Sequence, residues 1–333
     1  MVLVACSGGA DSLGLAAATA FEAPRRGIRA GALVVDHGLQ PGSPEVALEA
    51  ARQCEHLGLD PVEVYTVTVD AGSGQGPEAA ARAARHEAYA AAAREHGAAA
   101  VLLGHTRDDQ AEQVLLGLVR GSGTRSLAGM AQRRGILHRP FLALTRAQTE
   151  QACAAQGLTP WADPHNDDER FTRVRARRLL ASLRAELDPA LDAALARTAD
   201  LARADADALD AYALALAGPQ EPPVAQEPAE SLERLAPMEP REPPRPQEPP
   251  GLAAVADTVW ECAALSGHPP AVTGRVWRIR AARLGIGALT SAHVQALEEL
   301  ARRRGLGPTS LPGGWRALRR GDRIHIEPPG RVE

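Results

Sequence analysis

The first half of the chain alternates between short apolar runs and longer stretches in which apolar residues recur every three or four positions. The short runs predict buried strands at residues 2–5, 30–35, 62–69, 99–103 and 136–139. The longer stretches predict helices at residues 12–21, 44–57, 78–96 and 109–119. Strands and helices alternating in this way predict an α/β fold with a doubly wound parallel sheet of five strands.

The second half of the chain reads as mainly helical, with one sharp break in composition. Helices are predicted at residues 145–156, 173–187, 189–216, 252–265, 272–284 and 291–304, and a small β-hairpin near the end. Residues 218–250 contain 11 prolines and seven glutamates, so this segment is expected to be a disordered linker. The predicted domains are therefore residues 1–186, a helical connector at 187–217, the linker, and a helical domain at 251–327 that ends in the hairpin.

A glycine-rich sequence, S-G-G-A-D-S at positions 7–12, joins the first predicted strand to the first predicted helix. Glycines there let the backbone approach a phosphate, and the N–H groups at a helix start attract an anion. A tight turn whose glycines only relieve backbone strain has the same appearance. Because hydroxyl groups add further donors, the full motif favours phosphate binding by Ser7, Gly8, Gly9, Ala10, Asp11 and Ser12.

Two adjacent acids, Asp108 and Asp109, follow the fourth predicted strand. Carboxylates at a helix start are favourable in any protein, because they cap its free N–H groups. In a parallel sheet, however, ligands bind beyond the carboxyl ends of the strands, where these acids would meet the glycine loop. They are then candidates to hold Mg²⁺ on a triphosphate. The neighbouring His105 either donates a hydrogen bond to a phosphate or only caps the strand.

Arginines gather at three further places. Arg120 precedes a G-S-G loop and either reaches a phosphate or caps a helix end. Residues 170–184 carry six arginines beside an acidic loop, and another basic group spans residues 302–323. Each group is either a solvated face or a polyanion site, and a chain of net charge −4 favours the second interpretation. Only 3% of residues are aromatic, so salt-sensitive phosphate contacts rather than base stacking should dominate.

The composition excludes several classes of site. All 37 basic residues are arginine, so neither a phosphate loop with its lysine nor a Schiff-base lysine is possible. The four cysteines (Cys6, Cys54, Cys153 and Cys262) form no C-x-x-C pair, which favours reduced thiols and a cytoplasmic protein. No signal peptide or membrane-spanning run is visible, so no membrane partner is expected. The chain opens directly on its first strand, which leaves open whether Met1 is the true start.

The motif at positions 7–12 resembles the loop of the N-type ATP pyrophosphatases, the PP-loop superfamily. Within it, further motifs are similar to those of the tRNA(Ile)-lysidine synthetases. They are V-D-H-G-L at 35–39, H-x-x-D-D-Q-x-E at 105–112, R-G-S-G at 120–123, R-P-F-L at 139–142 and D-P-H-N-D at 163–167 with the arginines that follow. L-P-G-G at 311–314 resembles the end of short actinobacterial members. The resemblance covers most of the chain except residues 218–250.

The resemblance implies a two-step reaction on the isoleucine tRNA that has a CAU anticodon. The C2 oxygen of the wobble cytidine attacks the α-phosphorus of ATP and pyrophosphate leaves. The ε-amine of free L-lysine then attacks C2, and AMP leaves to give lysidine. Residues 1–186 would be the catalytic domain, and residues 251–327 would bind tRNA.

The resemblance also implies roles for particular residues, with ATP and Mg²⁺ as cofactors. ATP would be bound by residues 7–12 together with Asp36 and His105. Catalytic roles fall to Asp11, Asp108, Asp109 and Arg120, and Asp11 and Asp109 would hold Mg²⁺. The lysine ammonium would be held by Asp108, Asp109 and Glu112. The tRNA would contact Arg173, Arg175, Arg177 and Arg178. No residue is assigned as the general base for the lysine amine.

Two positions depart from the family pattern, because Val174 stands where many members have Asn and Gln148 stands where an acid is common. Three alternatives stay open. A tRNA thiolase of the same superfamily would need a cysteine pair, and a small-molecule amide synthetase would leave the arginine groups unexplained. A module that binds ATP or RNA without catalysis would release no pyrophosphate. The oligomeric state is open, with a homodimer as one option.

Overall fold

The computed structural model describes residues 1–36, 38, 42–67, 77–121, 123–218 and 258–330. Contacts divide the chain into two units, Met1–Ala206 and Asp207–Glu333, and each is described by itself. The linker expected at residues 218–250 lies outside the described residues, apart from Gly218. In the described part of the chain, no helix has both the length and the apolar character needed to cross a membrane.

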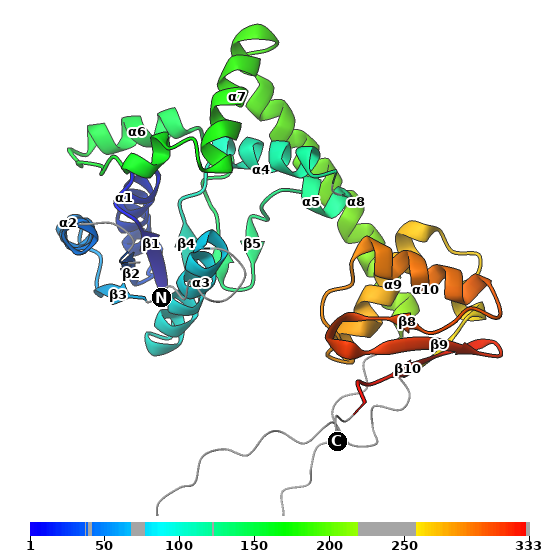
Figure 1. The fold of residues 1–333 in the computed structure, drawn as a ribbon. Coiled ribbons are helices and arrows are strands. Elements are labelled where there is room, and N and C mark those ends of the chain that lie inside the picture. The colour runs from blue at the N-terminus through cyan, green and yellow to red at the C-terminus, as the bar shows by residue number, and fades with distance from the viewer. Residues whose placement is uncertain (37, 39–41, 68–76, 122, 219–257, 331–333) are drawn as a thin grey trace, which may run out of the picture. The chain divides into compact units, whose positions relative to one another are not determined.

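The first unit is built on a six-stranded sheet (Figure 1) with the order β3-β2-β1-β4-β6-β5. Its strands are β1 (Val2–Cys6), β2 (Ala30–Asp36), β3 (Val62–Thr66), β4 (Ala100–Leu103), β5 (Arg133–Arg134) and β6 (Leu137–His138). All neighbours except β5 pair in parallel, which confirms the five predicted strands and their doubly wound arrangement. The sequence missed the sixth strand, β5, which pairs antiparallel with β6 and consists of two exposed arginines without apolar alternation.

Helices cover both faces of this sheet, because alternate residues of each strand point to opposite sides. Val4 and Cys6 face a core shared with α1 (Ala10–Arg25) and α2 (Ser43–His56). Leu3 faces a second core shared with α3 (Pro77–Glu95). The remaining helices of the unit are α4 (Arg107–Val119), α5 (Thr124–Leu127), α6 (Arg146–Ala155) and α7 (Thr172–Glu186). Helix α8 (Leu191–Ala217) begins in this unit and ends in the second.

The segment after β4 passes directly against the start of α1. A Cβ atom on Gly104 would lie 2.7 Å from the backbone oxygen of Asp11 and 3.0 Å from the backbone nitrogen of Ser12. Neither neighbour is a flexible side-chain end, so only glycine allows this approach. The approach brings the motif that follows β4 next to the motif that follows β1.

We therefore expect Gly104→Ala to destabilise the first unit by about 1–3 kcal/mol, because the backbone must shift to admit the methyl group. Gly123→Ala is the matched control, since nothing lies within 4 Å of the atom it adds and its φ is −68°. Chemical denaturation of both variants tests this. Equal stability of the two variants would contradict the close approach.

The second unit folds around two buried tryptophans. Trp260 and Trp277 are each 1% exposed, and their ring centroids lie 5.2 Å apart. Helices α9 (Pro270–Arg283) and α10 (Ser291–Arg302) share this core with a four-stranded antiparallel sheet of order β7-β10-β9-β8. Its strands are β7 (Val259–Glu261), β8 (Thr309–Ser310), β9 (Arg316–Arg320) and β10 (Arg323–Glu327). The predicted hairpin is confirmed as β9 and β10.

The prediction of a helix at residues 252–265 is wrong for residues 258–265, the part of this range that the structure describes. Residues 252–257 lie outside them, and the rest forms β7 and a short 3₁₀ turn at Ala263–Leu265. Trp260 pairs with Ile324 of β10, far away in the sequence. Long-range pairing and burial of the tryptophan therefore decide the conformation rather than local helix propensity.

Candidate active site

The glycine loop is fixed by its own hydrogen bonds and by a distant segment. Gly8 has φ of +82°, and its carbonyl oxygen accepts a hydrogen bond of 2.9 Å from the backbone N–H of Trp161. The Ser12 hydroxyl accepts from the backbone N–H of Ser7 at 3.1 Å and donates to the Gly9 carbonyl oxygen at 2.9 Å. Helix α1 begins at Ala10, so its first N–H groups point out of the loop, where they can bind an anion.

Asp11 lies in the first turn of α1, and α6 packs beside α1 (Figure 1). Its Oδ1 accepts a short hydrogen bond from the Thr149 hydroxyl, and its Oδ2 lies 3.4 Å from Nε of Arg146. Burial raises the pKa of Asp11, although the Thr149 hydrogen bond and the Arg146 charge oppose the shift. This carboxylate is therefore tied to a helix 135 residues away in the sequence.

The two acids that follow β4 both cap helices, and their role in holding Mg²⁺ stays a prediction. Asp109 Oδ2 caps the helix by accepting from the Thr106 backbone N–H at 2.8 Å, while its Oδ1 lies 3.0 Å from Nη2 of Arg146. Asp108 Oδ2 accepts from the backbone N–H of Arg146 at 2.9 Å and so caps α6. The acids are ordinary helix caps and also converge on one arginine.

Glu112, one turn further along α4, is almost completely enclosed, with its side chain 4% exposed. Its Oε1 accepts from Nε of Arg177 at 2.8 Å and lies 3.7 Å from Nη1 of Arg146. Its Oε2 is buried and has no hydrogen-bond partner among the described residues. Burial raises the pKa of Glu112, and the Arg177 hydrogen bond and charge act in the opposite direction.

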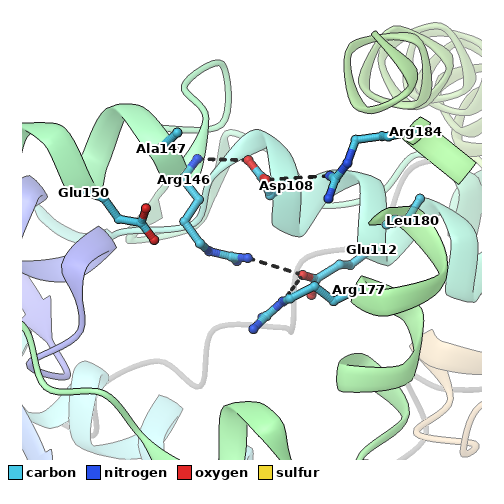
Figure 2. Close-up of a pocket in the computed structure, with 8 residues that line it drawn as sticks. All are labelled: Asp108, Glu112, Arg146, Ala147, Glu150, Arg177, Leu180 and Arg184. Atoms are coloured by element: carbon cyan, nitrogen blue, oxygen red, sulfur yellow. Dashed lines mark hydrogen bonds and ion pairs between the residues drawn. The ribbon is translucent and has the colours of Figure 1, made fainter. Parts of the chain in front are cut away.

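These groups surround a cavity of ≈ 230 Å³ (Figure 2). Figure 2 shows Arg146 and Arg177 both directed at Glu112, and Arg184 directed at Asp108. The cavity is lined by Asp108, Glu112, Arg146, Ala147, Glu150, Arg177, Leu180 and Arg184. Three carboxylates and three guanidinium groups thus face one small space, which suits a ligand that carries charges of both signs.

The other residues predicted for the nucleotide site lie at the same sheet edge. His105 follows β4, and burial together with the nearby charges of Arg139 and Arg173 lowers its pKa to about 4, against the effect of Asp109. His105 is therefore neutral at pH 7. Asp36, at the end of β2, accepts from the Gly38 N–H at 2.9 Å and the Ser43 hydroxyl at 2.7 Å, which holds the turn after the strand.

Arg120 lies away from these acids, at the opposite end of α4. It is exposed and follows the last residue of α4, eleven residues after Asp109. At the rise of an α-helix this places its backbone roughly 16 Å from that of Asp109. A role for Arg120 at the phosphates stays a prediction.

The arginines of α7 divide into two groups. Arg177 and Arg184 line the cavity, whereas Arg175 is exposed and donates to the Thr172 hydroxyl at 3.3 Å. Arg178 pairs with Glu169, and Arg173 is half-buried. In the second unit, most arginines of the predicted basic group form ion pairs, and all of these except Arg319 are exposed: Arg302, Arg304, Arg316, Arg319, Arg320 and Arg323.

Sequence reasoning missed three residues of the site, all on α6: Arg146, Thr149 and Glu150. One local signal was available. Gly14 interrupts the otherwise apolar pattern of α1, and a Cβ there would lie 3.4 Å from the Thr149 backbone oxygen. An isolated glycine in a helix points to a close neighbour, which here is α6.

The two departures from the family pattern have ordinary structural roles. Gln148 Oε1 accepts from the Thr145 backbone N–H at 2.8 Å, so its amide caps α6 as an acid would. Val174 is 6% exposed and packs inside the unit as a core residue of α7.

Comparison with known proteins identifies the family. A family model described as a PP-loop domain, ATP_bind_3, matches residues 1–183. The tRNA(Ile)-lysidine synthase of Leifsonia xyli subsp. xyli is 50% identical over 319 residues, which cover 94% of this chain and 86% of that protein. The chain belongs to the tRNA(Ile)-lysidine synthase family. The resemblance drawn from its motifs is thereby confirmed.

Two further tRNA(Ile)-lysidine synthases are similar in sequence to this chain over nearly its whole length. The Streptomyces coelicolor protein is 49% identical, with 98% of this chain and 85% of that protein covered. The Thermobifida fusca protein is 47% identical, with 98% and 91% covered. A solved U34-tRNA thiolase, NcsA from Methanococcus maripaludis, aligns with a TM-score of 0.49 and 17% identity over 61% of this chain and 72% of that chain.

This member of the tRNA(Ile)-lysidine synthase family does bring two cysteines together, which the sequence did not predict. A hydrogen bond with Cys54 lowers the pKa of Cys6, at the end of β1, to about 7 against the effect of burial. Both side chains are inaccessible, with 3% and 0% exposure. They pack in the core between β1 and α2 and cannot meet a large substrate there.

Loss of Arg146 should make the stability of the first unit depend more strongly on pH. In Arg146→Met, Asp11, Asp109 and Glu112 lose a shared positive partner, so the folded-state pKa values of Asp11 and Glu112 rise further. A carboxyl whose folded pKa is raised destabilises the fold when it is ionised and ceases to do so as the pH falls. We expect the free energy of unfolding of Arg146→Met to be about 2–3 kcal/mol lower than that of the parent protein near pH 7.5. This difference should shrink toward pH 5.

Denaturation of the variant across this pH range measures the effect. Arg170→Met is the matched control, because it removes an exposed arginine that pairs only with Asp168 among the described residues. Its deficit should stay within about 0.5 kcal/mol. A deficit in Arg146→Met that is independent of pH would contradict the assignment of Arg146 as the shared counter-charge.

Proposed function

We propose that this chain attaches free lysine to the wobble cytidine of the isoleucine tRNA with a CAU anticodon. The cytidine C2 oxygen first attacks the α-phosphorus of ATP, and pyrophosphate leaves. The ε-amine of lysine then attacks C2, and AMP leaves. Family membership supports the reaction. The observation that carries the lysine step is Glu112, whose side chain lines the charged cavity and whose buried Oε2 has no partner among the described residues.

The glycine loop supports the nucleotide half of the site. Its N–H groups and the Ser7 hydroxyl would bind phosphate oxygens, and the neutral His105 would donate without adding charge. Asp11 and Asp109 converge on one cation, which in this structure is the Arg146 guanidinium. Two converging carboxylates fit Mg²⁺ once Arg146 moves away, and the metal would then neutralise the charge of the triphosphate.

The charges of the cavity support the lysine half of the site. Lysine carries two ammonium groups and one carboxylate. Glu112 and Glu150 would each take an ammonium group, and the guanidinium of Arg184 or Arg177 would take the carboxylate. Arg146 contacts both Asp11 and Glu112, so the cavity adjoins the phosphate-binding loop. The two substrates would therefore lie on opposite sides of one side chain.

Product analysis tests this function. We expect that an isoleucine tRNA transcript incubated with the protein, ATP, Mg²⁺ and lysine yields lysidine at the wobble position, as mass analysis of its nucleosides would show. A transcript with uridine at that position is the control and should remain unmodified. A sulfur-containing nucleoside, formed when a sulfide donor replaces lysine, would support a thiolase instead. Absence of pyrophosphate release would support a module without catalysis.

The two groups of arginines on α7 should act on different substrates. Arg175→Gln should weaken tRNA binding several-fold and reduce its salt dependence by about one released ion, because an exposed phosphate contact is lost. Arg177→Gln should raise the KM for lysine tenfold or more, because its side chain lines the cavity. Filter binding at several salt concentrations and steady-state kinetics separate the two effects. Equal changes in both parameters for both variants would contradict this division.

A further inference from the structure

The second step of the proposed reaction needs a base, and the inference made here rests on that function. The ε-amine of lysine has an ordinary pKa near 10.4, so at neutral pH it is an ammonium without a lone pair. A side chain that accepts this proton must lie within hydrogen-bond reach of the amine and must have an oxygen or nitrogen that is free to accept.

Two acids of the site lack such an atom. Asp11 accepts from Thr149 with one oxygen and faces Arg146 with the other. Asp109 uses one oxygen to cap α4 and the other to bind Arg146. Proton transfer to either of them would disrupt a contact that holds the site together. Asp108 caps α6 with Oδ2, and its Oδ1 lies 4.0 Å from the guanidinium of Arg184, whose positive charge opposes protonation.

Glu112 differs from these acids because its two oxygens have different surroundings. Oε1 is held by Arg177 at 2.8 Å, which fixes the orientation of the carboxylate (Figure 2). Oε2 is buried and has no hydrogen-bond partner in the described part of the chain, and the Glu112 side chain lines the cavity. We propose that Oε2 of Glu112 is the general base that removes a proton from the ε-ammonium of lysine.

The burial of Glu112 favours this transfer. Arg177 of α7 and Arg146 of α6 face it, and Asp109 precedes it on α4. Burial, together with Asp109, raises the pKa of Glu112 against the effect of the two arginines. A carboxylate with a raised pKa is a stronger base toward the ε-ammonium.

The proposed step is balanced in atoms and electrons. The ε-ammonium gives one proton to Oε2, which leaves the nitrogen with a free electron pair. This pair forms the bond to C2 of the adenylated cytidine, which leaves the nitrogen with two protons and a positive charge. The bond between C2 and the bridging oxygen breaks, and its electron pair leaves with AMP. The nitrogen then gives its second proton to a phosphate oxygen of the departing AMP or to solvent, and the proton on Glu112 passes to solvent.

Glu112→Gln tests the proposal, because the amide still accepts from Arg177 but cannot take a proton. The tRNA is first adenylated with ATP in the absence of lysine, and lysine is then added so that a single turnover is followed. We expect normal pyrophosphate release in the first stage. Lysine transfer should be slowed at least 100-fold at pH 7 even with saturating lysine, and should recover about tenfold per pH unit toward pH 9.

A second nucleophile sharpens the test. S-aminoethylcysteine resembles lysine but has a less basic terminal amine, so it depends less on a base. Glu112→Gln should therefore prefer it to lysine, whereas the parent protein should not. Glu150→Gln, the matched control in the same cavity, should raise the KM for lysine without changing the pH profile.

The outcomes separate this proposal from the proposed function. If saturating lysine restores transfer in Glu112→Gln, or if the variant keeps the parent's pH profile, Glu112 only binds the substrate and the proposal is overturned. A parent protein that forms no lysidine contradicts the proposed function itself. Glu112→Asp keeps a carboxylate but moves it, and partial activity with the parent's pH profile is expected if the variant folds.

Discussion

The convergence of acidic side chains on Arg146 is the interaction on which the site depends. Asp11 belongs to the helix that follows β1, whereas Asp109 and Glu112 belong to the helix that follows β4. Their charges repel one another in a partly buried place, so a shared positive partner is required. Arg146 supplies it from a third helix, and its backbone N–H also binds Asp108. One residue therefore joins the nucleotide loop to the lysine cavity.

Close packing makes this convergence possible. Gly104 lets the segment after β4 touch the start of α1, and Gly14 lets α6 approach the side of the same helix. Together these contacts bring the segments that carry Asp11, Asp109 and Arg146 within hydrogen-bond reach of one another. The same edge of the parallel sheet collects the ends of β1, β2 and β4, as doubly wound folds require. A small backbone shift at either glycine would separate charges that stabilise each other.

The sequence predicted the parallel strands and the acidic candidates because both depend on local patterns. The apolar runs mark buried strands, and the acids mark helix starts directly after them. Arg146 and Thr149 could not be found in this way, because their roles depend on how α6 packs against a segment about 135 residues earlier. Arg177 was predicted to contact tRNA, yet its side chain faces Glu112 inside the first unit. A helix carrying five arginines does not reveal from its sequence which of them face inward.

The most direct measurement is a crystal structure of the protein with lysine and a non-hydrolysable ATP analogue. We expect that the phosphates lie on the loop at residues 7–12 and that lysine fills the cavity with its ε-amine at Glu112 Oε2. We also expect that the Arg146 guanidinium has moved from between Asp11 and Asp109. Lysine bound elsewhere, with Arg146 still bridging these carboxylates beside bound nucleotide, would contradict the roles assigned to Arg146 and Glu112.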